Sequence, residues 1–191
     1  MGMEYELKFR ATEAVQRKIL QDHPGSWQAV SMETTYYDTP TGALSARHYT
    51  LRRRLENGVS VCTLKTPAQN GARGEWETEC DSIERAIPTL CKLSGLEGQL
   101  PLTESGVIAV CGARFTRQYL SIPFGESVLE LALDAGVLFN GNKQCPLCEV
   151  EIELKTGSVS DANACALIFR QKYSLQTEPK SKFLRAKELG L

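Results

Sequence analysis

The 191-residue chain has no long hydrophobic run, no dominant charge of one sign and only two histidines. No apolar stretch approaches the about 20 residues that a membrane-spanning helix needs. The N-terminus alternates polar and apolar residues instead of forming an apolar signal sequence. We therefore expect a cytoplasmic protein without a membrane partner. The length favours one domain over residues 1–191, large enough to form a core without disulfides.

The charge balance also argues against nucleic acid as a partner. Lys and Arg number 22 against 23 Asp and Glu, so the formal net charge is −1. Nucleic-acid binders normally carry a basic excess concentrated on one face. Any anion must therefore be bound by local placement of basic side chains, and oligomeric state stays open.

Several common catalytic or metal-binding motifs are missing. The seven cysteines are scattered, and the close pair Cys145 and Cys148 lacks the second pair or histidine that a zinc site requires. Reduced thiols are expected. The chain has no Gly-rich phosphate-binding loop, and neither His23 nor His48 lies in a nucleophile pattern.

Strand patterns dominate what is present. Alternation indicates strands near residues 3–9, 34–38, 49–55, 59–65, 74–79, 113–122, 127–134, 137–139 and 147–155. Asn57-Gly58 predicts a hairpin, and Gly136 and residues 140–142 predict further turns. Helical patterns start after residue 11 and cover residues 82–93, where Pro88 should end or kink the helix, and 161–173. The pattern indicates an α+β fold in which a long meandering sheet curls or closes.

Charged residues repeat along single strand faces. Glu4, Glu6 and Lys8 share one face because successive side chains in a strand point to opposite sides. The same spacing recurs in further sets: Arg52 and Arg54; Lys65; Glu75, Glu77 and Glu79; Glu149, Glu151 and Glu153. Each ladder alone fits a solvent face. Several together favour a wet interior, since like charges need counter-charges or a bound ion.

Such an interior suits one class of ligand. Carboxylates supply hard oxygen ligands for Mg²⁺ or Mn²⁺, whereas Arg and Lys supply donors for phosphate oxygens. Both sets in one cavity indicate a polyanion bound together with its metal.

The segment Glu4-Tyr5-Glu6-Leu7-Lys8 resembles the ExExK signature of the CYTH superfamily, also called triphosphate tunnel metalloenzymes. Further segments match that family in order: residues 36–40, 51–54, 63–65, 75–77, 114–117, 130–136, 149–154 and 181–185. One departure is Ala186, where the family often has glycine. The resemblance implies a closed eight-stranded antiparallel β-barrel, the triphosphate tunnel, with flanking helices.

The resemblance also implies roles for individual residues. The phosphate chain would be bound by Lys8, Arg52, Arg54, Lys65, Arg117 and Lys182. Mg²⁺ or Mn²⁺ would be bound by Glu4, Glu6, Glu149 and Glu151. Glu6 and Lys8 would act in catalysis with Glu75, Glu77 and Asp134, which orient basic side chains, support a second metal or position the attacking water.

The expected activity is metal-dependent hydrolysis of a small-molecule triphosphate, above all inorganic tripolyphosphate. The family also contains thiamine and RNA triphosphatases and class IV adenylyl cyclases, which make cyclic AMP from ATP. Trp27, Tyr37 or Tyr49 could stack on a base, although packing roles are more common for such residues. A polyphosphate-binding module without turnover is the third hypothesis.

Overall fold

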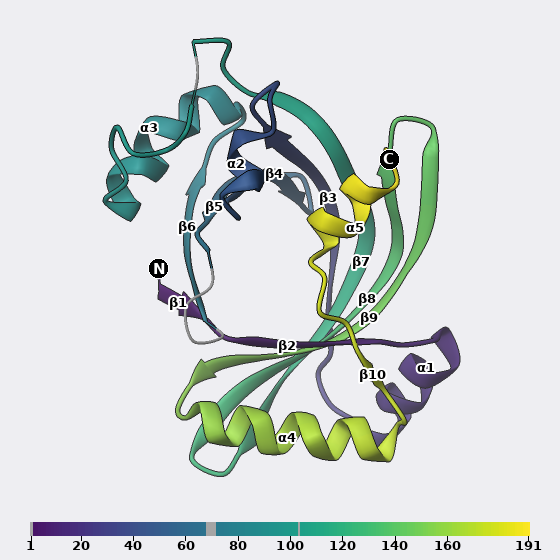
Figure 1. Cartoon of the computed structure of the whole chain (residues 1–191). Helices are drawn as coiled ribbons and strands as arrows, with labels where there is room; N and C mark the ends of the chain where they lie inside the picture. Colours follow the sequence, from purple (N-terminus) through teal and green to yellow (C-terminus); the bar gives the residue numbers. More distant parts are fainter. Residues whose placement is uncertain (1, 68–71, 103) are drawn as a thin grey trace.

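The computed structural model describes residues 2–67, 72–102 and 104–191 of the chain (Figure 1). Its strands are β1 (Gly2–Glu4), β2 (Glu6–Arg10), β3 (Gln28–Asp38), β4 (Thr50–Glu56), β5 (Val59–Lys65), β6 (Arg73–Glu79), β7 (Ile108–Phe124), β8 (Ser127–Asn140), β9 (Lys143–Thr156) and β10 (Gln176–Thr177). Its helices are α1 (Glu13–Asp22), α2 (Ala43–Ala46), α3 (Ile83–Ser94), α4 (Val159–Lys172) and α5 (Lys182–Glu188).

The strands form one antiparallel sheet in the order β1-β6-β5-β4-β3-β7-β8-β9-β2-β10. The predicted closed eight-stranded barrel is therefore wrong, because this sheet has ten strands and two ends. The reason lies at Tyr5, which divides the first strand into β1, paired with β6, and β2, paired with β9. The sheet nevertheless curls around a central opening, which Figure 1 shows face on.

Turn chemistry explains part of this arrangement. Asn57 and Gly58 adopt φ angles of 49° and 91° and join β4 to β5, which confirms the predicted hairpin. The turn predicted at Gly136 is wrong, since this residue lies inside β8. A Cβ there would lie 2.1 Å from the carbonyl oxygen of Arg114 on β7, so only glycine fits this close approach of two strands.

Two apolar cores lie on the outer side of the sheet under α1, α4 and α3, whereas the core under α5 lies on the inner face and borders the cavity. One core places Ile19 of α1 and Phe169 of α4 against Ile152 of β9. A second core seats α5 on the sheet, and a third packs α3 on β4 and β5. Helix α3 runs through Pro88 without ending there. Beyond the part that α5 covers, the inner face of the sheet is left to polar side chains.

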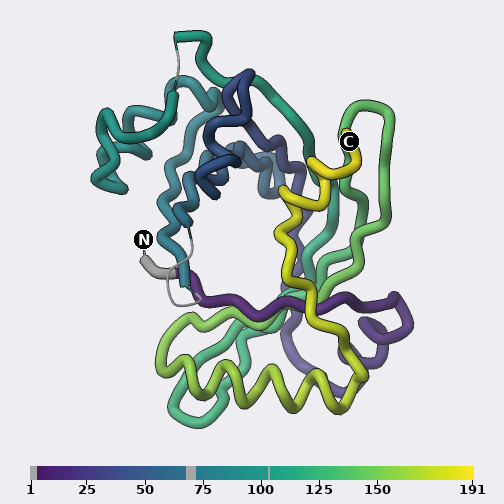
Figure 2. Tube along the Cα trace, in the orientation of Figure 1, coloured from purple at the N-terminus to yellow at the C-terminus, as the bar shows by residue number. Residues whose placement is uncertain are grey.

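The two chain ends take different paths around the opening. The N-terminal segment supplies β1 and β2, and the C-terminal segment runs from α4 along β2 through β10 to α5 at the rim, as Figure 2 shows. All seven cysteines are unpaired thiols. In the described ranges, no helix combines the length and the apolar character needed to cross a bilayer.

Candidate active site

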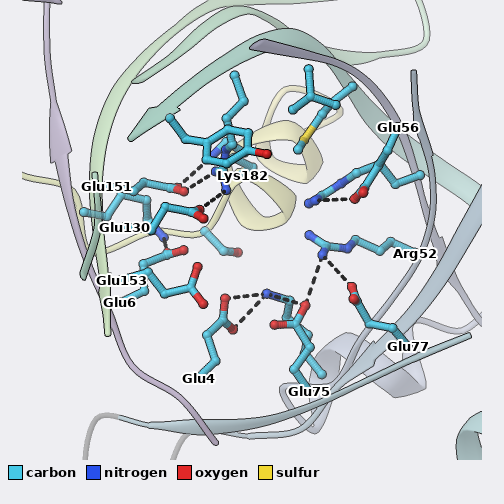
Figure 3. Close-up of a pocket in the computed structure, with 18 of the residues that line it drawn as sticks. Glu4, Glu6, Arg52, Glu56, Glu75, Glu77, Glu130, Glu151, Glu153 and Lys182 are labelled. Carbon is cyan, nitrogen blue, oxygen red and sulfur yellow. Dashed lines mark hydrogen bonds and ion pairs between the residues drawn. The ribbon is translucent and has the colours of Figure 1, made fainter. Parts of the chain in front are cut away.

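A cavity of about 790 Å³ lies inside the curled sheet, and its walls carry charges of both signs (Figure 3). It brings together residues from both ends and the middle of the chain. The site residues indicated by the sequence that line it are Glu4, Glu6, Lys8, Arg52, Arg54, Lys65, Glu75, Glu77, Arg117, Glu151 and Lys182. The inward face of nearly every strand therefore contributes to one polar chamber.

One wall carries a row of three carboxylates. Glu6 of β2, Glu153 of β9 and Glu130 of β8 are direct cross-strand partners and all line the cavity. Lys8 Nζ lies 3.1 Å from Glu6 Oε1, and the partly exposed Lys155 lies 2.9 Å from Glu153 Oε1. Burial raises the pKa of Glu153, and the negative charges of Glu4 and Glu130 add to that rise. Three like charges are therefore held side by side, and Lys155, which also lies 3.5 Å from Glu130 Oε2, compensates two of them in part.

The facing wall carries buried guanidinium groups from β4. Arg52 Nη2 donates to Glu75 Oε1 at 3.1 Å, whereas Arg52 Nε is buried without a hydrogen-bond partner among the described residues. Arg54 donates to Glu56 Oε1 at 3.2 Å. Burial lowers the pKa of Arg54, and the positive charges of Arg52 and Arg117 lower it further. Arg54 therefore lies close to like charges, whereas burial would lower the pKa of Arg52 but Glu75 and Glu77 raise it.

Glu4 is held at the edge of the basic wall. Lys65 Nζ donates to both of its oxygens at 2.8 Å, and Arg73 Nε donates at 3.1 Å. Burial alone would raise the pKa of Glu4, but Lys65 and Arg73 bring it down to about 2. Glu75 accepts from the same lysine at 3.0 Å. Glu4 is thus an ionised carboxylate whose charge is already compensated.

A buried acidic cluster of Asp134, Glu149 and Glu151 lies where α5 packs on the sheet. Lys182 Nζ lies 2.8 Å from Asp134 Oδ2, 2.6 Å from Glu149 Oε2 and 2.5 Å from Glu151 Oε1. Burial would lower the pKa of Lys182, but these three carboxylates raise it well above its ordinary value. Within the described residues this is the one acidic group compact enough to hold a metal ion, and an ammonium group lies against all three members.

The same cluster orients a second cation. Arg117 donates to both oxygens of Asp134 at 2.8 Å and also contacts Glu151. Asp134 and Glu149 are 0% exposed and do not line the cavity, in contrast to the other predicted site residues. Helix α5 covers these two carboxylates, because its residues Lys182 and Phe183 lie between them and the cavity.

The site predicted from the sequence left out five charged residues of the cavity: Glu56, Arg73, Glu130, Glu153 and Lys155. All five carried a usable signal. Glu153 continues the alternation of Glu149 and Glu151, Arg73 lies two residues before Glu75, and Glu130 shares the face of Asp134. Lys155 is two residues after Glu153, and Glu56 is two residues after Arg54, so the period of two places both on cavity-facing sides.

The aromatic residues considered for base stacking lie elsewhere. Trp27 packs against the core under α1 and α4, while Tyr37 and Tyr49 pack against the core under α3. In the described part of the chain, the tyrosines that line the cavity are Tyr36 and Tyr119. Tyr119 donates its hydroxyl to Gln28 Oε1 at 2.7 Å.

Comparison with known proteins places this geometry in a family. The sequence model of the CYTH domain matches residues 2–186. An inorganic triphosphatase from Haemophilus influenzae is 32% identical over 136 residues, which are 70% of this chain and 39% of that protein. This chain thus spans about two fifths of the length of its curated relative.

Solved structures share the fold at lower identity. A candidate adenylyl cyclase from Hippeastrum, in which a dominant triphosphatase activity is found, is 16% identical with a TM-score of 0.68, covering 98% of this chain and 96% of that one. A candidate adenylate cyclase from Bacillus halodurans is 17% identical with a TM-score of 0.62, covering 95% and 96%. With the motif order, the charged cavity and a domain match over residues 2–186, the chain belongs to the CYTH domain family.

Proposed function

We propose that this protein is a metal-dependent triphosphatase whose main substrate is inorganic tripolyphosphate. The observation that carries the proposal is a single cavity in which buried basic groups lie close together on one wall and carboxylates lie close together on the other. Arg54 lies among like charges on the basic wall, and Glu153 lies among like charges on the acidic wall. A triphosphate bound with a divalent cation compensates both walls at once.

The named relatives support this choice of reaction. The Haemophilus influenzae relative is an inorganic triphosphatase, and triphosphatase activity is dominant in the Hippeastrum protein. The aromatic residues suggested for base stacking pack in the outer cores, so they offer no pocket for adenosine. Without such a pocket, cyclisation of ATP ranks second. It is kept as a candidate because the similar Bacillus halodurans protein is a candidate adenylate cyclase.

Six basic side chains would bind the phosphate chain from around the cavity: Lys8, Arg52, Arg54, Lys65, Arg117 and Lys182. Among these side chains, Arg52 keeps one buried donor, Nε, that has no hydrogen-bond partner in the described residues. Arg and Lys neutralise the charge on phosphate oxygens and hold the chain in one orientation. Hydrogen bonds from these groups strengthen as charge develops on the leaving diphosphate.

The oxygen donors for a divalent cation fit best on the acidic row. Glu4, Glu149 and Glu151 each lie within 2.8 Å of a buried lysine ammonium group, which leaves them less open to a metal than the sequence indicates. Glu6, Glu130 and Glu153 face the cavity, and Glu153 is paired with Lys155, whose side chain is 41% exposed and can turn to solvent. When bound there, Mg²⁺ or Mn²⁺ neutralises charge on the phosphate oxygens.

The remaining predicted catalytic residues take supporting roles. Asp134 orients Arg117 through two hydrogen bonds, and Glu75 orients Arg52 and Lys65. Glu77 accepts from Thr63 at 2.9 Å, and its side chain is 46% exposed at the cavity. Glu77 is thus the member of this set with room to hold an attacking water by a hydrogen bond.

The test is a side-by-side assay with tripolyphosphate, ATP and thiamine triphosphate, each with and without Mg²⁺ or Mn²⁺. Released phosphate and cyclic AMP are both measured. Metal-dependent phosphate release that is fastest with tripolyphosphate is the expected result. Cyclic AMP formed from ATP would replace the proposal with the cyclase, and no product from any substrate would leave a polyphosphate-binding module.

A further inference from the structure

Glu178 is a buried carboxylate outside the cavity, directly after β10. The residue is 3% exposed. Its Oε2 accepts from Arg10 Nε at 2.6 Å, and its Oε1 accepts from the backbone N–H of Lys180 at 3.0 Å. Burial would raise the pKa of Glu178, but these hydrogen bonds lower it below its ordinary value. Glu178 is thus an ionised group held in place from two sides.

The backbone of Glu178 reaches the strand that carries Lys8. Its N–H donates to the carbonyl oxygen of Lys8 at 2.8 Å, next to the short pairing of β10 with β2. This bond fixes the C-terminal segment against β2 at the position where the Lys8 side chain enters the cavity. The segment between β10 and α5 therefore starts at a fixed position relative to Lys8.

The carboxylate of Glu178 is connected to Lys182, the second cavity lysine, by side chains of alternating charge. Its Oε2 lies 3.5 Å from Arg185 Nη1, and Arg185 Nη2 donates to Glu149 Oε1. Glu149 Oε2 in turn lies 2.6 Å from Lys182 Nζ. Glu178 is therefore connected to the ammonium group of Lys182 by three ion pairs in series, through Arg185 and then Glu149.

Lys8 and Lys182 need such support because they repel each other. Both ammonium groups act on Glu151. Burial and the charge of Lys182 work to lower the pKa of Lys8, although Glu6 and Glu151 raise it overall. Like charges in a poorly solvated site move apart unless other groups hold them.

We propose that Glu178 is a positioning residue for the triphosphate site, which sets Lys182 relative to Lys8 through Arg185 and Glu149. This inference rests on the proposed function. Glu178 does not touch the cavity, so it acts only through its partners. Substituting Glu178→Gln removes the charge that holds Arg185, while the backbone bond to Lys8 stays. The variant therefore tests the ion pairs that connect Glu178 to Lys182, separately from the backbone contact with Lys8.

The experiment is a double-mutant cycle on kcat/KM for tripolyphosphate with Mg²⁺, supported by calorimetric binding of tripolyphosphate. Wild type, Glu178→Gln, Lys182→Ala and the double variant are compared. We expect Glu178→Gln to lower kcat/KM about tenfold alone and less than twofold when Lys182 is already alanine. The matched control is Glu188→Gln, which removes an exposed partner of Lys180 in the same tail and should change nothing.

The outcomes separate the two proposals. Equal losses from Glu178→Gln in both backgrounds would show a general structural role and overturn this inference alone, as would wild-type activity in Glu178→Gln. A wild-type protein that neither binds nor hydrolyses tripolyphosphate would overturn the proposed function itself. If Glu178→Gln does not fold, Arg185→Lys, which shortens the next link, replaces it in the same cycle with the same expectation.

Discussion

Glu153 of β9 lies directly opposite Glu130 of β8 in the sheet, and both carboxylates line the cavity. Like charges at paired positions of an antiparallel sheet destabilise it. Lys155 Nζ lies 3.5 Å from Glu130 Oε2 and 2.9 Å from Glu153 Oε1, so one ammonium group is shared between the two carboxylates.

Neutralising one member of the carboxylate pair should weaken metal use. In Glu153→Gln, the Mg²⁺ concentration for half-maximal phosphate release should rise about tenfold, equivalent to about 1.4 kcal/mol. The melting temperature without metal should stay level or rise, because repulsion by Glu130 is relieved. Metal titration of activity and thermal unfolding measure the two effects.

The control for this substitution is Glu79→Gln, which removes an exposed carboxylate of β6 that does not line the cavity. It should leave the metal dependence at the wild-type value. A Glu153→Gln enzyme with an unchanged Mg²⁺ requirement would assign the cation to other carboxylates.

Two neighbouring arginines on β4 should behave very differently. Arg52 faces the cavity with a side chain 9% exposed, whereas Arg53 points outward and donates to the carbonyl oxygen of Asp81 at 2.8 Å. Losing a charged hydrogen bond to phosphate costs about 2 kcal/mol, so Arg52→Ala should lower kcat/KM about 30-fold or more. Arg53→Ala should change it less than twofold, and comparable losses in both would refute the face assignment.

Glu4 should link stability to acid pH. Its pKa is about 2 in the folded protein against an ordinary 4.5, so its ion pairs contribute about 3 kcal/mol that is fully present above pH 4.5. This contribution is lost as the pH falls towards 2, because protonation removes the charge that Lys65 and Arg73 hold. The destabilisation of Glu4→Gln relative to wild type should therefore shrink between pH 5 and pH 2.5.

Urea unfolding across that pH range measures the effect. Glu13→Gln serves as the control, since Glu13 forms an exposed pair with Arg17 and has a side chain 81% exposed. Its difference from wild type should be small at every pH. A Glu4→Gln deficit that stays constant down to pH 2.5 would contradict the role of its ionised form.

The local sequence pattern predicts much of this site. The period of two places Glu4 and Glu6, Arg52 and Arg54, and Glu75 and Glu77 on shared faces without knowledge of any partner strand. The hairpin at Asn57-Gly58 follows from the φ angles that these two residues accept. Such features depend on residues within a few positions of one another, and for this reason the amino-acid sequence by itself determined them.

Which face turned inward, and what lay in front of it, depended on contacts between distant segments. The division at Tyr5 follows from pairing with β6 on one side and β9 on the other, which made a ten-stranded sheet of the expected closed barrel. Glu149 left the cavity wall because Lys182 arrives on α5 and lies against it. Only the tertiary structure decided these points, since register and burial arise from long-range packing that strand periodicity does not encode.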